Sequence, residues 1–367
     1  MKTSAKFALG SCILLLIIIA ALLVPSFFNN STTPKTPNLT TVRVAVTPYQ
    51  DTTLMLYGKE KGYFKEVGID LQVRDSTWNE QIEFTAGKGC DIAMATIDEI
   101  VAKSRSLNKV GKRVLYFLPA WLFEGTIFAC RDDMLTYKEV QQKYGEEGAK
   151  AKFLAQLKDK IIAVPEGGVY EQAIHKFIES AGLNVDDFQF VNSQLEVGIN
   201  GLRDEDVGIA AAGIVERPEA LRRGYKIALD SIDLNIVVIT GFICNAEFYN
   251  QHTDAVEKYA KGWYKSVTEA LKHPKENYKI VKTYIDERGG KPPSFEDFKT
   301  ALSFQKIAKS PEEAKKMFLD KDSPMYWEMA WDAAVHNLIS TGKRDRVPSS
   351  KKDFIGEIVL NQIIQNH

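Results

Sequence analysis

The chain has 367 residues, 45% of them hydrophobic and 26% charged, which is long enough for two lobes that each bury a core. Its formal net charge of -1 and its pI of about 6.6 exclude a broadly basic protein built to bind nucleic acid or an acidic membrane surface. The four cysteines form no close pair such as C-x-x-C, so a zinc site or a thioredoxin-like redox motif has no support.

Residues 1–28 have the pattern of an export signal or of a membrane anchor. Lys2 and Lys6 precede an uncharged apolar stretch over residues 7–24, and Pro25 follows it. The length of this stretch lies on the border between a signal core and a membrane-spanning helix, so cleavage and retention both remain open. In either case we expect the folded part to lie outside the cytoplasm, in the periplasm or on the outer face of the cytoplasmic membrane.

A short box that resembles a lipoprotein signal occupies residues 9–12, but the apolar core follows Cys12 instead of preceding it, which disfavours lipidation. Residues 29–41 are polar and contain prolines. They have too few apolar groups to fold, and they therefore predict a tether.

Residues 42–98 predict three short strands, at 42–46, 69–73 and 91–95, separated by helices. Helices of this length between strands imply parallel crossovers, and open α/β sheets bind ligands outside the carboxyl ends of their strands. The loops after the three strands should therefore form one binding rim. Its expected ligand-binding residues are Tyr49, Gln50, Asp51, Thr52, Trp78, Asn79, Thr96 and Asp98.

Two segments of this region resemble a known family. Residues 56–71, LYGKEKGYFKEVGIDL, are similar to the opening of the solute-binding proteins for nitrate, sulfonates, taurine and thiamine-pyrimidine precursors, which feed ABC importers. Residues 84–93, FTAGKGCDIA, resemble the family's helix-to-strand turn of the form A-G-K-x-D-I. The resemblance implies an α/β fold of the two-lobe periplasmic-binding-protein type II. Each lobe would be a mixed, mainly parallel sheet flanked by helices, and a two-strand hinge would join the lobes.

The next part of the chain predicts the crossing into the second lobe. Residues 113–118 and 126–130 read as strands, and residues 119–125 read as a loop that places Trp121 and Glu124 at the rim. In the family this is where the chain first leaves the first lobe. A polar helical stretch at 137–158 predicts an insertion on the surface of the second lobe.

The second lobe repeats the plan of the first, with strands predicted at 161–165, 188–192 and 206–212. Two glycines at the start of the helix after the first of these strands let the backbone approach an acceptor or an anion, although an ordinary tight turn would use them as well. The expected ligand-binding residues of this rim are Glu166, Gly167, Gly168, Val169, Tyr170 and Gly213.

Residues 236–245 echo residues 125–131, and we expect the two segments to be the hinge strands. Cys130 and Cys244 occupy matching positions in them, which leaves a disulfide and two buried free thiols as alternatives. The predicted division is 42–129 for the first part of lobe one, 130–235 for lobe two, and 236–367 for the return to lobe one with the C-terminal helices.

No catalytic constellation is evident. The five histidines are dispersed, and neither H-x-x-x-H nor G-x-S-x-G occurs. We therefore expect no enzyme, no cofactor and no metal. An enzyme of the same fold, such as the pyrimidine synthases or dehydratases that the family resembles, is an alternative, but the C-C-C-F-C signature of those synthases is absent. A membrane-tethered sensory domain is a further alternative.

The acidic residues of the rims suggest the ligand. Asp51, Asp98, Glu124 and Glu166 lie in these loops and Glu216 lies near the last one, while the loops contain no Arg or Lys. Together with the rim aromatics, this favours a neutral or amine-bearing aromatic ligand, such as a thiamine pyrimidine precursor. The alternatives are an anion of the sulfonate, taurine or nitrate type, or carboxylates that only cap helices.

The expected mechanism is capture without catalysis. Both lobes contact a small molecule, the closed state is favoured, and an ABC permease reads that state. We expect a monomer that meets the membrane only through its N-terminal segment and binds no nucleic acid.

Overall fold

The computed structural model describes residues 39–47, 53–165, 169–214, 216–236, 238–340, 342–348 and 350–351, apart from the side chains of Asn79 and Ser104. The predicted signal or anchor at 1–28, with its lipoprotein-like box, lies outside the described residues, as does nearly all of the predicted linker. Among the described helices, none is long and apolar enough to cross a membrane.

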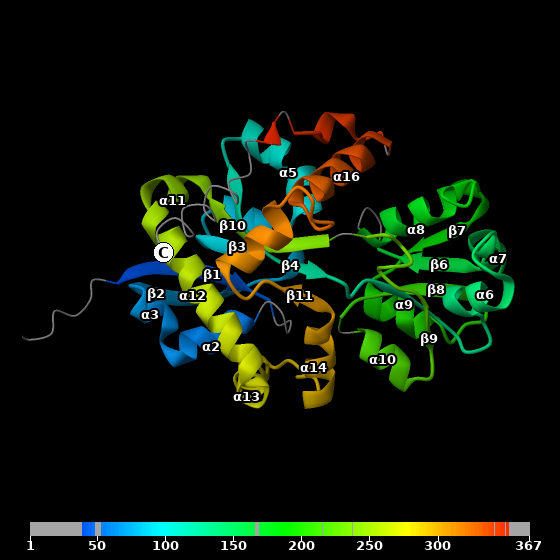
Figure 1. The fold of residues 1–367 in the computed structure, drawn as a ribbon, viewed down its shortest axis with the longest axis horizontal. Coiled ribbons are helices and arrows are strands. Elements are labelled where there is room, and N and C mark those ends of the chain that lie inside the picture. Colours follow the sequence, from blue (N-terminus) through cyan, green and yellow to red (C-terminus); the bar gives the residue numbers. More distant parts are fainter. Residues whose placement is uncertain are drawn as a thin grey trace, which may run out of the picture. The chain divides into compact units, whose positions relative to one another are not determined.

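Six strands form the sheet of the first lobe, called sheet A here (Figure 1). Strand β1 pairs in parallel with β2 and β3, while β10 is antiparallel to β3 and β4, and β11 to β4. The three strands predicted at the start of the chain are confirmed. In spatial order the strands are β11 (Gln305–Ile307), β4 (Val114–Phe123), β10 (Val238–Asn245), β3 (Ile92–Thr96), β1 (Thr40–Val46) and β2 (Ile69–Asp75).

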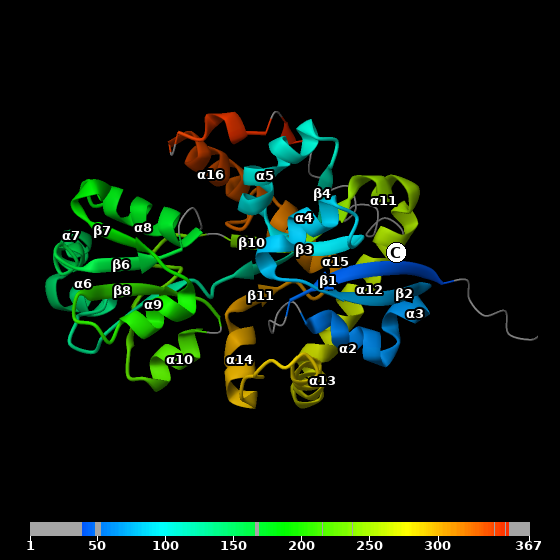
Figure 2. The same cartoon turned by 180° about the vertical axis from the view of Figure 1, so that it is seen from behind.

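Helices cover both faces of sheet A (Figures 1 and 2). One face carries α2 (Leu54–Lys61), α3 (Tyr63–Glu66), α12 (Thr253–Lys272) and α13 (Pro274–Asp286), and the other carries α4 (Gln81–Ala86), α5 (Ile97–Lys109) and α16 (Trp327–Ser340). Further short helices are α11 (Ala246–Gln251), α14 (Phe295–Ser303) and α15 (Pro311–Ala314). Gly58 lets α2 approach α12 closely, because its N–H donates to Ser266 Oγ at 2.7 Å and a Cβ there would lie 2.5 Å from Ser266 Cβ.

Five strands form the sheet of the second lobe, called sheet B here. Strand β6 is parallel to β7 and β8, and β5 is antiparallel to β8 and β9. In spatial order they are β7 (Gln189–Asn192), β6 (Ile161–Val164), β8 (Val207–Ala212), β5 (Ile127–Cys130) and β9 (Lys226–Leu229). Helices α6 (Tyr137–Tyr144), α7 (Ala149–Ala155) and α8 (Val169–Glu179) cover one face, and α9 (Leu195–Gly201) and α10 (Glu216–Arg222) cover the other.

The stretch at 137–158 is not a surface insertion, which corrects the prediction. It forms α6 and α7, which are separated by Gly145 and Gly148 at φ 80° and 77°. Its Tyr137 and Phe153 are buried and pack edge-on against Phe177 of α8. The charged residues of the sequence mark only the outer sides of these helices, and their aromatic residues build the core of the second lobe.

The two segments predicted as paired hinge strands lie in different sheets. Strand β5 belongs to sheet B and β10 lies in the middle of sheet A, so the chain passes between the sheets over residues 124–126 and again between β9 and β10. The predicted lobe boundary at 129 and 130 therefore differs from the place where the sheets change. Cys130 and Cys244 are both buried and free, so the structure has the free thiols and not the disulfide.

Candidate functional site

The carboxyl ends of the parallel strands mark one edge of each sheet. In sheet A these ends are Val46, Asp75 and Thr96. Tyr49, Gln50, Asp51 and Thr52 follow β1 and lie outside the described residues, as do Glu166, Gly167 and Gly168 after β6. The backbone of Asn79 lies in the turn η2 (Trp78–Glu80), but its side chain is not described. The binding roles of these eight residues remain predictions.

Trp78, Thr96 and Glu99 form a hydrogen-bonded cluster at the edge of sheet A. Thr96 caps α5 and accepts the N–H of Glu99 at 3.4 Å, and its own N–H donates to Glu99 Oε2 at 2.9 Å. The other carboxylate oxygen, Oε1, accepts a hydrogen bond from the indole Nε1 of Trp78 at 2.8 Å. The structure thus brings together two predicted residues through a third, Glu99, that the prediction missed. The pattern T-x-x-E at 96–99 is typical of a capping box and was the available signal.

Asp98 and Glu99 are neighbouring carboxyls that have lost part of their hydration. Burial raises the pKa of Glu99 to about 7, and the negative charge of Asp98 adds to the rise. Burial also raises the pKa of Asp98, while the Thr96 hydroxyl and the positive charge of Lys176 on α8 oppose that rise. A pair of carboxyls in this environment gains more from a ligand that donates hydrogen bonds or carries an amine than from an anion.

Trp121 does not lie on a loop, which corrects the prediction. It belongs to β4, is fully buried, and packs on Trp263 with ring centroids 6.0 Å apart. The sequence suggests a break at Pro119, because proline cannot donate to a sheet ladder. In the structure Pro119 lies opposite Gly241, next to a register shift after which Trp121 lies opposite Thr240, and such a bulge lets the strand continue past the proline.

Glu124 lies at the rim, but its charge is paired. Its Oε1 lies 2.7 Å from Nζ of Lys306 on β11, and its side chain is 26% exposed. Its backbone N–H donates to Phe304 O, and its carbonyl accepts from Ser231 Oγ of the second lobe. The inference of an unpaired acidic rim was therefore wrong for Glu124, because the partner comes from a distant strand.

In the second lobe, Tyr170 and Gly213 come together. Val169 and Tyr170 open α8, and Gly213 follows β8. A Cβ on Gly213 would lie 3.0 Å from the Tyr170 hydroxyl, and the Gly213 N–H donates to Glu216 Oε2 at 3.1 Å. Burial raises the pKa of Glu216. The Glu216 carboxylate thus binds the backbone beside it, as a helix cap does.

Arg217 is a cation that the prediction missed. It lies in α10 next to Glu216, and the loops whose lack of Arg and Lys suggested an acidic rim did not include this helix. Its guanidinium carbon lies 3.8 Å from the ring centroid of Phe304 in the first lobe. Its Nε is buried and has no hydrogen-bond partner within the described part of the chain. The geometry is that of a cation–π contact between the lobes.

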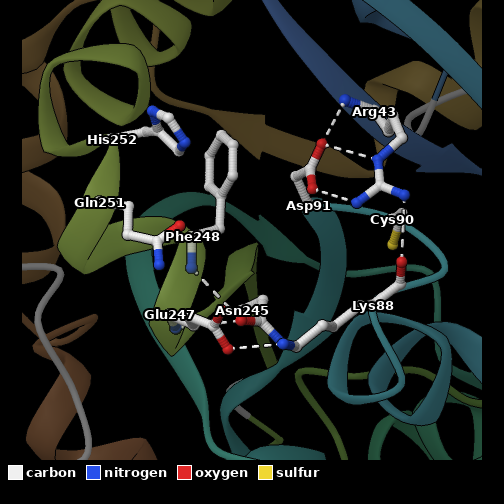
Figure 3. Close-up of a pocket in the computed structure, with 9 residues that line it drawn as sticks. All are labelled: Arg43, Lys88, Cys90, Asp91, Asn245, Glu247, Phe248, Gln251 and His252. Carbon is white, nitrogen blue, oxygen red and sulfur yellow. Dashed lines mark hydrogen bonds and ion pairs between the residues drawn. The ribbon is translucent and has the colours of Figure 1, made fainter.

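A pocket of about 230 Å³ lies away from these residues, at the amino-terminal end of β3 (Figure 3). Arg43 and Asp91 form a two-bonded ion pair on one side of it, at 2.5 and 3.0 Å. Lys88 pairs with Glu247, and Phe248 packs against His252. The charged groups of this pocket are satisfied by one another, so we do not assign a ligand to it.

Metal binding finds no support in the part of the chain that the structure describes. No three His, Cys, Asp or Glu side chains there gather closely enough to hold an ion.

Comparison with known proteins links the chain to two groups. Residues 145–277 match the sequence family described as "NMT1/THI5 like". A curated relative is the 4-amino-5-hydroxymethyl-2-methylpyrimidine phosphate synthase THI5 of Saccharomyces cerevisiae, which is 26% identical over 255 residues, or 65% of this chain and 68% of the yeast protein.

Two solved structures share the fold. The aliphatic sulphonate binding protein SsuA of Escherichia coli superposes with a TM-score of 0.61 at 11% identity, covering 84% of this chain and 97% of that protein. The nitrate-binding protein NrtA of Synechocystis gives a TM-score of 0.53 at 15% identity, covering 86% of this chain and 93% of that protein. The chain therefore has the two-lobe type II fold of the periplasmic binding proteins, as predicted. Its predicted resemblance to the solute-binding proteins for nitrate, sulfonates and thiamine-pyrimidine precursors is confirmed by the family match together with these structural neighbours.

Proposed function

We propose that the chain is an extracytoplasmic solute-binding protein, which captures a small molecule between its lobes and delivers it to an ABC-type import permease. The fold supports this, because one structural neighbour is the ligand-binding component of an ABC-type import system of Staphylococcus aureus and another is a periplasmic aliphatic sulphonate binding protein. Each sheet also presents the carboxyl ends of its parallel strands, where ligands of α/β sheets bind. Closure follows if the ligand binds the closed form more tightly than the open one.

The proposed ligand is a neutral or amine-bearing heteroaromatic molecule, such as a thiamine pyrimidine precursor. The observation that carries this choice is the cluster of Trp78, Asp98 and Glu99 at the end of β3. An indole ring offers a flat surface for stacking, and the two carboxyls accept hydrogen bonds from an amine. The name of the yeast relative, which contains an aminopyrimidine, agrees with this choice.

A ligand that carries an acidic group is the second candidate, and Arg217 favours it. The buried Nε of Arg217 has no partner among the described residues, and an anion at the rim would supply one. Lys306, the cation next to the rim, is already paired with Glu124. For an amine-bearing ligand the decisive charges are those of Asp98 and Glu99 in the first lobe, and for an acidic ligand the decisive charge is that of Arg217 in the second lobe.

An enzyme is the third candidate, because the yeast relative is named a synthase. The identity of 26% leaves the reaction untested in this chain.

A thermal-shift screen of the full chain in mild detergent tests these proposals, because a ligand specific to the native state raises the melting temperature by mass action. The panel contains aminopyrimidines, thiamine, flavins, aromatic amines, taurine, alkanesulfonates, nitrate and bicarbonate. A shift with an amine-bearing ring, with the ligand recovered unchanged, supports the proposal. A shift only with sulfonates or nitrate keeps the binding function and overturns the choice of ligand. A ligand recovered as a product would support the enzyme.

A further inference from the structure

The chain contains two capping boxes of the same pattern among the described residues. In the first, Thr96 and Glu99 cap α5, and in the second, Thr136 and Glu139 cap α6. In both, the glutamate carboxylate accepts the N–H of the threonine, at 2.9 Å and 2.6 Å. Local helix capping therefore explains one hydrogen bond of each glutamate and leaves its remaining interactions to be explained.

The remaining interactions differ between the two boxes. Glu139 forms an ion pair with Lys226 at 3.0 Å, with both side chains partly exposed. Glu99 instead accepts the indole N–H of Trp78. A capping glutamate has no need of an indole donor, so the Trp78 contact points to a task other than stabilising α5.

The contact between Trp78 and Glu99 spans the edge where a ligand is expected. In sheet A, β1 lies between β3 and β2, so the bond connects the element after β2 to the helix after β3, over the end of β1. Trp78 opens a single turn of three residues, and so short a turn fixes a large ring poorly by itself. Packing against the core holds part of the ring, and the carboxylate fixes its orientation.

We propose that Glu99 is a positioning residue, whose carboxylate fixes the Trp78 indole as a flat wall of the binding site, and that the ligand is a flat, electron-poor or cationic ring that stacks on this wall. The inference rests on the proposed solute-binding function and makes its ligand class more specific. An indole that donates its N–H to a carboxylate keeps its electron-rich face for stacking, which attracts a protonated aminopyrimidine more than a neutral alkyl sulfonate.

The groups around Glu99 belong to several elements. Asp98 precedes it on α5 and adds negative charge, and the backbone and hydroxyl of Thr96 donate to it. Asp98 in turn feels the charge of Lys176 on α8 and lies near enough to Tyr116 on β4 to raise that hydroxyl's pKa. Loss of the proton from Glu99 near neutral pH should therefore strengthen its hold on the indole, and Asp98 opposes that loss.

The test compares Glu99→Ala, Glu99→Gln, Trp78→Phe and Glu139→Ala in the full chain. The signal of Trp78 is the near-ultraviolet circular dichroism of the wild type minus that of Trp78→Phe, measured without ligand. We expect Glu99→Ala to remove most of this signal and to weaken binding of 4-amino-5-hydroxymethyl-2-methylpyrimidine about tenfold or more, since a hydrogen bond to a charged group is lost. Glu99→Gln keeps the capping box and should retain part of the Trp78 signal and part of the affinity. It therefore provides a test if the alanine variant fails to fold.

Glu139→Ala is the matched control, because it removes the same kind of cap from a helix whose capping glutamate pairs with Lys226 and holds no indole. It should leave the Trp78 signal and the affinity unchanged. The inference is overturned if Glu99→Ala and Glu99→Gln keep the full Trp78 signal, or if Glu139→Ala weakens binding as much as Glu99→Ala does. Absence of binding by every ring in the wild type would overturn the stacking ligand, and absence of binding by every member of the panel would overturn the proposed function as well. The circular dichroism would then still decide whether Glu99 holds Trp78.

Discussion

The starts of α5 and α6 use the same four-residue pattern and have opposite electrostatics. At α6, the backbone N–H of Thr136 and the Lys226 ammonium lower the pKa of Glu139. At α5, burial and the charge of Asp98 raise the pKa of Glu99 to about 7. The cap geometry is thus set by local sequence, while the charge of the glutamate is set by what the fold packs against it. Glu99, the capping glutamate that is costly to ionise, is therefore the better candidate for a functional role.

The largest expected effect is on ligand affinity, and it distinguishes Asp98 from Glu124, which the sequence predicted to have the same role. Asp98→Asn should weaken binding of an aminopyrimidine ten- to a hundredfold, because the amide replaces one acceptor oxygen of the carboxyl with a donor that faces the amine. Glu124→Gln should change the affinity little, because Glu124 is already paired with Lys306. Titration calorimetry of both variants measures this. Equal losses of affinity would mean that the ion pair of Glu124 with Lys306 opens on binding. No loss of affinity in either variant would show that Asp98 does not contact the ligand.

The pH dependence of stability should have opposite signs at the two boxes. The folded-state pKa of Glu99 is raised from 4.5 to about 7, so its contribution is fully present below pH 4.5 and is lost as the pH rises through about 7. We expect the wild type to lose on the order of 2 kcal/mol relative to Glu99→Gln over this window. For Glu139 the pKa is lowered, so its small contribution is present above pH 4.5 and is lost as the pH falls. Urea unfolding of the wild type, Glu99→Gln and Glu139→Gln at several pH values checks both expectations. The same pH dependence of the stability difference from the wild type in the two variants would refute the contrast.

Removing the capping hydroxyl should lower the stability equally at Thr96 and at Thr136, and it should weaken ligand binding only at Thr96. Thr96→Ala and Thr136→Ala should each lower the free energy of unfolding by about 1 kcal/mol. Only Thr96→Ala should also weaken ring binding, because Glu99 loses a partner that holds it near Trp78. Denaturant melts together with calorimetry measure the pair. A loss of affinity in Thr136→Ala would show that the effect is general destabilisation.

The smallest effect is expected at the ion pair of the second box. The Lys226 and Glu139 side chains are 27% and 42% exposed, so Lys226→Gln should cost well under 1 kcal/mol. Raising the salt concentration should remove most of the difference between this variant and the wild type. A difference that persists at high salt would mean that Lys226 acts through packing instead of charge.

Local sequence predicted the parallel strands and the edge at which Thr96 and Trp78 meet, because short apolar runs and glycine breaks are local properties. It missed what depends on distant partners. Lys306 reaches Glu124 from a strand more than a hundred residues later, and Arg217 meets Phe304 of the other lobe. It also placed Trp121 on a loop, because Pro119 resembles a break unless its own strand bulges beside it. The roles of Tyr49 and Gly167 remain predictions, since both lie outside the described residues.

The central position of β10 has a consequence for the order of folding. Sheet B is built from one continuous stretch, from β5 at residue 127 to β9 at residue 229, whereas β3 and β4 of sheet A are joined only by β10, which is synthesised afterwards. Until residue 245 has emerged, β3 and β4 each carry an unpaired inner edge. The second lobe can therefore finish first during synthesis, while the first lobe waits as an incomplete sheet whose unpaired strand edges can pair with other chains.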